Sequence, residues 1–298
     1  ALLGAAGLLL LVVFGLKAAF LPLYFWLPKA YASATAPVAA LFAIMTKVGL
    51  YSIIRVYTLI FGDEAGSLAN MANDWLWPIA LLTLALGVIG ALAAVSLQGL
   101  LAYLVVVSVG TLLAGIAIGT EQALAAALYY LVHSTWVAGG LFLLADLIAR
   151  QRGVKEALLV QGPALQNPHL LGALFFFGAI AVAGLPPLSG FIGKLLLLRS
   201  LEPGLQALML WPVVLGGGLL TLIALSRAGS MLFWRVGLSQ LDSAELDYGR
   251  LLACAGLLLL SLLLMVGAAP LLSYVEATAS QLHDLALYRQ IIESGAAR

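Results

Sequence analysis

Charged residues are scarce in this chain of 298 residues. Aspartate, glutamate, lysine and arginine together make up 9% of it, whereas a soluble domain usually carries about 25%. Hydrophobic residues account for 63%, and the mean hydropathy is +1.11. The chain is therefore predicted to be a polytopic membrane protein embedded in a lipid bilayer. Its net charge of +1 excludes the strongly basic surface expected of a nucleic-acid-binding protein.

Cysteine is nearly absent, since Cys254 is the single one and lies in an apolar run. The chain can therefore form no internal disulfide and no cysteine-based zinc site. No phosphate-binding loop, metal-ligand spacing or nucleophile–base pair stands out, so we expect no cofactor, no metal and no enzymatic activity. The sequence opens at Ala1, in mid-hydrophobic sequence and without a basic flank. We expect it to be a piece of a longer protein that has lost its N-terminal part.

Charge-free runs predict an all-α fold of about eight membrane spans, each of about 20 residues. They are expected at 2–27, 35–61, two within 75–120, 122–147, 170 onward, 205–234 and 251–272. Two spans are expected to be discontinuous. Pro22 interrupts the first, and Pro186 with Pro187 interrupts the sixth between Gly184 and Gly190, because proline lacks the N–H that continues a helix.

The loops differ in the sign of their charge. Those after spans 1, 5 and 7 carry basic residues, namely Lys29, Arg150, Arg152, Lys155, Arg235 and Arg250. Those after spans 2 and 4 carry acids and no basic residue, namely Asp63, Glu64, Asp74 and Glu121. The positive-inside rule places the basic loops in the cytoplasm, so both ends of the chain are expected on the outer side.

Four ionisable side chains interrupt the apolar spans deeply: Lys17, Lys47, His133 and Lys194. A charge at the bilayer centre costs at least about 2.5–3.5 kcal/mol, so each calls for a partner or a function. Lys17 and Lys194 could instead extend their ammonium groups to the membrane interface. Lys47 lies in the middle of its span, which makes that alternative weaker, and His133 could be a neutral histidine hydrogen-bonded between helices.

A row of such groups is the physical basis of a proton relay. Burial disfavours a charged ammonium, which allows a lysine to exchange its proton near neutral pH, where histidine already titrates. The thirteen acids of the chain all lie outside the deep parts of the spans, and Asp146 is most simply the i,i+4 partner of Arg150. A counter-charge is therefore expected from the absent N-terminal part or from another subunit.

Four segments carry a family resemblance: GLKAAFLPLYFWLPKAYASATAPVAALFAIMTKVGLYSIIR, LAYLVVVSVGTLLA, ALYYLVHSTWVAGGLFLLADLI and AGLPPLSGFIGKLLLL. They resemble the proton-translocating antiporter family, which includes antiporter-like membrane subunits of respiratory complex I and large subunits of Mrp-type cation/proton antiporters. The sequence around His133 and the PPLSGFIGK segment look most like the D subunit of the Mrp-type complex. The resemblance extends over nearly the whole chain up to about Trp234.

The resemblance implies a fourteen-helix fold with two inverted five-helix repeats, of which this chain would be the C-terminal part. Residues 1–62 would hold the last two helices of the first repeat and 75–236 the second repeat, followed by a final helix over 250–272 and a tail over 273–298. Lys17, Lys47, His133 and Lys194 match the family's relay residues. The glutamate that pairs with the first lysine would lie in the missing segment. Ser96–Leu100 departs from the charged turn often found in relatives.

The leading interpretation is a proton-translocating subunit of a multisubunit antiporter that exchanges protons for a monovalent cation, with Na⁺ favoured. It would be a multi-pass protein of the bacterial cytoplasmic membrane, assembled with other membrane subunits. The alternative is a proton-pumping subunit of a complex I type NADH:quinone oxidoreductase. An intramembrane hydrolase or a purely structural subunit is a third class, which the absence of a nucleophile–base pair and the presence of buried charges disfavour.

Overall fold

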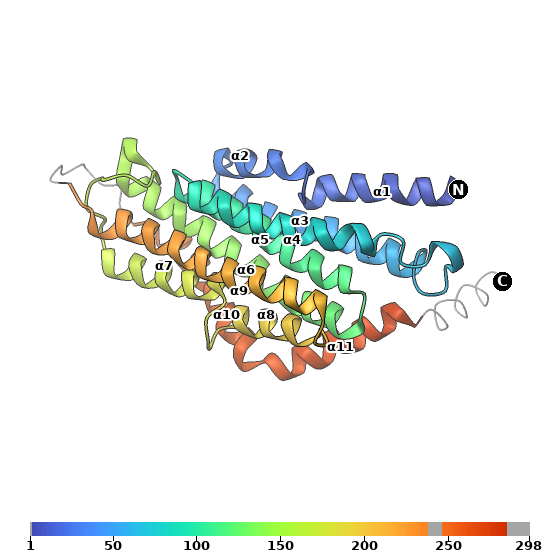
Figure 1. The fold of residues 1–298 in the computed structure, drawn as a ribbon. Helices are drawn as coiled ribbons and strands as arrows, with labels where there is room; N and C mark the ends of the chain where they lie inside the picture. Colours follow the sequence, from blue (N-terminus) through green and yellow to red (C-terminus); the bar gives the residue numbers. More distant parts are fainter. Residues whose placement is uncertain (1, 238–245, 285–298) are drawn as a thin grey trace, which may run out of the picture.

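The computed structural model describes residues 2–237 and 246–284, and in these ranges the chain forms helices joined by turns (Figure 1). The helices are α1 (Leu2–Ala18), α2 (Trp26–Ser33), α3 (Ala36–Leu59), α4 (Asn73–Ala93), α5 (Leu97–Ile118), α6 (Glu121–Arg152), α7 (Pro168–Ala183), α8 (Ser189–Arg199), α9 (Leu205–Gly229), α10 (Tyr248–Val266) and α11 (Ala268–His283). Within the described residues, β pairing consists of two isolated bridges, Ser96–Leu158 and Gly162–Val236.

Seven helical segments of the described chain are long and apolar enough to cross a membrane, which confirms an all-helical membrane protein. They cover Leu2–Ser33, Ala36–Leu59, Gly66–Ala93, Leu97–Ile118, Glu121–Arg152, Leu205–Trp234 and Tyr248–Val266. The sixth predicted span is not among these seven. It is divided into α7 and α8, which have 16 and 11 residues and are each too short to cross alone.

Helix α6 lies in the middle of the bundle. It packs against α3, α5, α8, α10 and α11, and most of its residues are buried, as are those of α5. Neither helix has one distinct polar face, which is the pattern of a helix enclosed by others. Helix α1 lies at one edge of the bundle and keeps an exposed apolar face (Figure 1). The centre around α6 is therefore where a polar side chain is best shielded from lipid.

The helix breaks at the first predicted place, between Ala18 and Leu23, and its free backbone groups find partners. The Leu21 N–H donates to Thr83 Oγ1 on α4 at 3.0 Å. The indole of Trp26 donates to the Leu16 carbonyl, also at 3.0 Å. Irregular backbone at membrane depth is tolerated only when such groups are satisfied inside the protein. The second predicted break is also present, between Ala183 and Ser189.

Several boundaries differ from the sequence-based expectation. Lys29 was expected in a loop but lies within α2, because Pro28 falls in the first turn of that helix, where no N–H is needed. Arg152 was expected in a basic loop but ends α6 with 1% of its surface exposed. Its guanidinium donates to carbonyls of the following segment, namely those of Glu156, Leu158 and Val160.

Two helices cover the region expected to hold the final span and the start of the tail. Helix α10 ends at Val266, and α11 follows after Gly267, whereas one span was expected over 251–272. The predicted tail is described only as far as Asp284 and otherwise lies outside the described residues. Asp247 caps the start of α10 by accepting the Arg250 backbone N–H, and this hydrogen bond holds the pKa of its carboxyl below the usual range.

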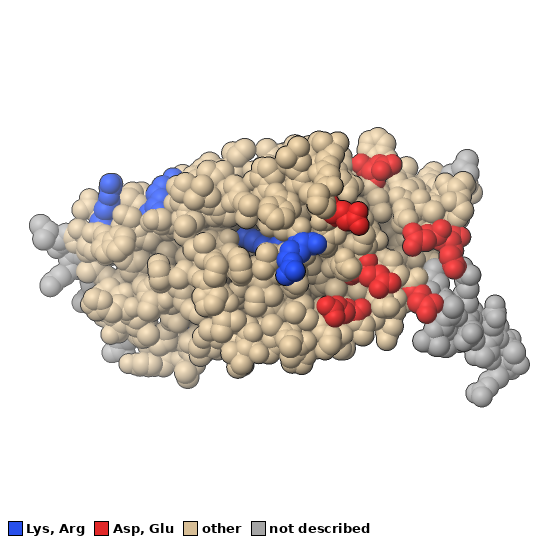
Figure 2. Space-filling view, turned by 60° about the horizontal axis from the view of Figure 1, so that its bottom comes forward, with Lys and Arg blue, Asp and Glu red and all other residues tan. Residues whose placement is uncertain are grey.

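The charged residues separate toward the two ends of the molecule. Figure 2 shows acidic side chains gathered toward one end of the visible face, with basic side chains at the opposite end and in the middle. At the basic end, Asp146 pairs with Arg150 at 2.8 Å and also with Arg250. The acidic loops and the basic loops identified in the sequence therefore lie toward opposite ends of the structure.

Candidate functional site

Lys47 occupies the middle of α3 and is 2% exposed. Its Nζ donates to Ser108 Oγ on α5 at 3.1 Å, and Ser108 Oγ donates in turn to the Val105 carbonyl at 2.7 Å. The ion pairs of the described residues do not include Lys47. A buried ammonium that meets one hydroxyl and no carboxylate is costly, so this arrangement suits a group that can give up its proton.

Ser108 also lines a small cavity that continues to His133 on α6. The cavity has a volume of about 20 Å³ and is bordered by Tyr130 and Ser134 among other residues. A cavity needs about 10–15 Å³ to hold one water molecule, and that water needs polar partners. The cavity thus has room for a single water between the Ser108 hydroxyl and the imidazole of His133.

His133 is 1% exposed and belongs to a polar cluster shared by three helices. Its Nδ1 lies 2.8 Å from Ser189 Oγ on α8. Ser189 Oγ is in turn 3.3 Å from Ser261 Oγ on α10. Because a hydroxyl both donates and accepts, Ser189 can bond to either tautomer of the histidine.

Lys194 lies on α8 one turn and a half after the second break and is 9% exposed. Its Nζ donates to the carbonyls of Ala183 at 2.9 Å and Val182 at 3.2 Å, both in the last turn of α7. Ammonium groups are favoured at such a position, since the carbonyl end of a helix carries a partial negative charge. Lys194 therefore faces the interior of the break.

The end of α7 also brings His133 close to this lysine. A Cβ built on Gly190 would lie 2.7 Å from His133 Nε2 and within contact distance of the Ala181 carbonyl. Only a glycine fits there. Three consecutive carbonyls of α7 thus face these two side chains. That of Ala181 lies beside the imidazole, and those of Val182 and Ala183 accept hydrogen bonds from Lys194.

Lys17 is separated from these three residues. It lies in the last turn of α1 with its side chain exposed, and in the described ranges it forms no hydrogen bond or ion pair. Its neighbour Ala18 packs against α3, where a Cβ on Gly49 would lie 2.6 Å from the Ala18 nitrogen. The structure therefore places Lys17 near α3 but on the outer face of the bundle.

Sequence reasoning missed the hydroxyl groups that connect the buried cations. Ser108, Ser189 and Ser261 are all buried, and each bonds to Lys47, to His133 or to another serine. The available signal was a single polar residue within an apolar run. That signal is weak, because serine is common in membrane helices and often bonds only to its own backbone, as Ser134 does with the Leu131 carbonyl.

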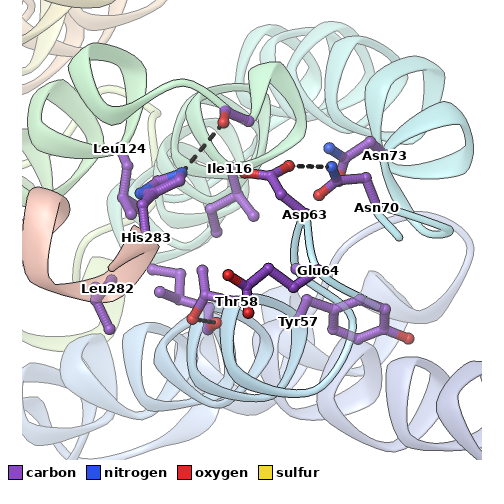
Figure 3. A pocket seen from close by; sticks show the side chains of 13 residues that line it. Tyr57, Thr58, Asp63, Glu64, Asn70, Asn73, Ile116, Leu124, Leu282 and His283 are labelled. Carbon is purple, nitrogen blue, oxygen red and sulfur yellow. Dashed lines mark hydrogen bonds between the residues drawn. The ribbon is translucent and has the colours of Figure 1, made fainter. Parts of the chain in front are cut away.

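A second polar region lies at the acidic end of the bundle (Figure 3). It is a cavity of about 60 Å³ whose polar lining includes Asp63, Asn70 and His283. Asn70 donates to Asp63 at 2.7 Å, and His283 Nε2 lies 3.2 Å from the Gly119 carbonyl. None of the four predicted relay residues lines it, so it is distinct from the buried cluster around His133.

Comparison with known proteins gives consistent matches. Residues 2–226 match the family model described as "NADH:quinone oxidoreductase/Mrp antiporter, TM". The chain is 37% identical to the D subunit of a probable K(+)/H(+) antiporter of Rhizobium meliloti (strain 1021), over 91% of this chain and 55% of that protein. It is also 37% identical to the D subunit of a Na(+)/H(+) antiporter of Bacillus subtilis (strain 168), over 93% of this chain and 55% of that protein.

The fold agrees with a solved structure. One chain of the Mrp complex from Dietzia sp. DQ12-45-1b superposes with a TM-score of 0.80 at 24% identity, covering 96% of this chain and 60% of that chain. The present chain thus spans about half the length of the curated relatives it matches. On the match to the family model over three quarters of its residues, the chain belongs to the NADH:quinone oxidoreductase/Mrp antiporter transmembrane family.

Proposed function

We propose that this chain is the proton-conducting part of the D subunit of an Mrp-type antiporter, which exchanges protons for a monovalent cation such as Na⁺ or K⁺. Protons would pass through Lys17, Lys47, His133 and Lys194. Both curated relatives described above are named as D subunits of cation/proton antiporters, which favours this function over that of a quinone oxidoreductase component. The chain would act as part of a transporter and not as an enzyme.

The observation that carries the proposal is the continuity of polar groups through the interior. Lys47 reaches Ser108, the cavity leads from Ser108 to His133, and the end of α7 connects His133 with Lys194. Each of these three ionisable groups is at least nine-tenths buried. Keeping three such groups inside a membrane bundle is expensive, and proton transfer is the function that makes use of them.

The remaining parts of the proposal concern the assembly. Lys17 faces outward at the middle of the Leu2–Ser33 segment, where lipid is an unfavourable neighbour for a charge. We propose that a carboxylate from another part of the full-length protein or from a neighbouring subunit covers it. The whole would be the C-terminal part of a fourteen-helix inverted-repeat fold in the bacterial cytoplasmic membrane.

The test is Lys47→Ala in the intact assembly reconstituted into vesicles. Decay of an imposed pH gradient on addition of Na⁺ or K⁺ should be abolished, because the buried group that Ser108 contacts is lost. The matched control is Lys29→Ala, which removes an exposed lysine on α2 and should leave exchange unchanged. Both assemblies must have the full set of subunits. Normal exchange by a fully assembled Lys47→Ala complex would overturn the proposed relay.

A further inference from the structure

The paired prolines at the second break leave two specific carbonyls without their helical partners. In an α-helix the carbonyl of residue i accepts the N–H of residue i+4. The partners of Val182 and Ala183 would be Pro186 and Pro187, and proline has no N–H. The Gly184 and Leu185 amides both donate to the Ile180 carbonyl, each at 3.1 Å, and so do not fill the gap.

These two free carbonyls bind a cation in this structure, namely the ammonium of Lys194. The two oxygens are 3.2 and 2.9 Å from its Nζ, and no ion pair of the described residues includes Lys194. Gly184 makes the approach possible. It has a φ of +80°, and a Cβ there would lie 2.7 Å from Lys194 Cδ. The break is therefore shaped to hold one positive charge with backbone oxygens.

We propose that the Val182 and Ala183 carbonyls form a binding site for a monovalent metal cation, and that Lys194 is a tethered cation competing for it. This inference rests on the proposed antiport function and names where the metal cation meets the proton path. Free carbonyls at the ends of interrupted membrane helices are a general means of coordinating Na⁺. Rings of backbone carbonyls likewise replace the hydration shell of K⁺ in channels.

Competition at this site would couple binding of the metal cation to displacement of the Lys194 ammonium. A metal cation and a protonated lysine cannot share two adjacent oxygens, because two like charges repel strongly in a poorly hydrated interior. The site therefore holds either the protonated Lys194 or the metal cation. His133 lies beside the preceding carbonyl of the same turn, which places the proton path next to the exchange site.

The experiment measures binding of ²²Na⁺ and of Rb⁺, as a K⁺ probe, to the purified intact assembly at one fixed pH. Lys194→Met removes the ammonium and keeps an unbranched side chain, so we expect at least a tenfold gain in affinity for one of the two cations. Arg199→Met removes a charge from the end of the same helix and should leave affinity unchanged. No gain with Lys194→Met would mean that Lys194 only caps α7, and would overturn the inference.

A second set of variants tests the carbonyls themselves. In the Lys194→Met background, Pro186→Ala and Pro187→Ala each return an N–H that can occupy one carbonyl, and each should remove most of the gain. Pro212→Ala, at a proline inside α9, is the matched control and should retain it. Undiminished binding in both proline variants would show that the cation binds elsewhere. If one variant fails to assemble, the other decides the point.

The same preparations separate this inference from the proposed function. Wild-type assembly that exchanges Na⁺ or K⁺ for protons in vesicles, together with no affinity gain in Lys194→Met, rejects the carbonyl site and leaves the proposed function standing. Wild-type assembly that exchanges neither cation rejects the proposed function, whatever the binding assay gives.

Discussion

Serine hydroxyls connect the buried ionisable residues of this chain. Ser108 accepts a hydrogen bond from Lys47 and borders the cavity shared with His133. Ser189 contacts His133 from the other side. A hydroxyl can donate and accept at once, so it can carry a proton between groups that do not touch. Ser108 thus combines a hydrogen bond to Lys47 with a place in the lining of this cavity.

Ser108→Ala is expected to slow proton exchange by about tenfold or more in the reconstituted assembly. The substitution removes a hydrogen bond to a charged group, which is worth about 1.5–3 kcal/mol, and it interrupts the route to the cavity. Ser108→Thr keeps the hydroxyl and should restore much of the rate. Ser200→Ala, outside the site, serves as a control. The measurement is the rate of pH-gradient decay, and equal rates for the alanine and threonine variants would contradict a role for the hydroxyl.

For single residues, the sequence predicted the burial of some ionisable side chains but not the exposure of others. A lysine or histidine in a long apolar run is conspicuous because of its cost in a membrane, so the burial of Lys47 and His133 could be expected. The exposure of Lys17 could not, because it depends on which face of α1 meets α3. Ser108 and Ser134 look alike in sequence, and only the rotation of their helices decides which one reaches a lysine.

The two interrupted helices illustrate how far sequence determines an element. Pro22 and the Pro186–Pro187 pair identified both breaks, since the loss of a backbone donor is a local property. Where the freed groups would bond could not be read from sequence, because their partners are distant in the chain. At the first break Thr83 on α4 accepts a backbone N–H, and at the second Lys194 donates to a backbone carbonyl. The helix around Lys29 was missed because a proline in a first turn supports a helix instead of ending it.

Thr83→Val is expected to destabilise the backbone conformation at the first break. The substitution keeps the shape of the side chain but leaves the Leu21 N–H without its acceptor in a partly buried setting, which costs about 1 kcal/mol or more. Hydrogen exchange of the backbone around residues 19–23 should accelerate in the assembled complex. Thr83→Ser retains the hydroxyl and should exchange as slowly as the wild type. Unchanged protection in the valine variant would show that Thr83 is not what holds the break.

At the scale of the whole molecule, charge distinguishes the two ends. The acids between α3 and α4 and in the first turns of α4 and α6 lie at one end. Lys29 on α2, and Lys155 and Arg235 in connections, belong to the other end. Arg152 no longer counts as a loop charge, because its guanidinium is buried among backbone carbonyls. The exposed basic residues that remain still outnumber the basic residues of the acidic end, which is the asymmetry that the positive-inside rule uses.

This asymmetry predicts the orientation of the chain, which single cysteines can measure. The native Cys254 is buried and its thiol donates to the Gly140 carbonyl, so it should not react with a membrane-impermeant maleimide. Asp74→Cys and Lys155→Cys replace exposed residues at opposite ends. Because basic loops remain in the cytoplasm, the cysteine at 74 should react in intact cells, whereas the one at 155 should react only in inverted vesicles. The reverse pattern would place the basic end outside and contradict the predicted orientation.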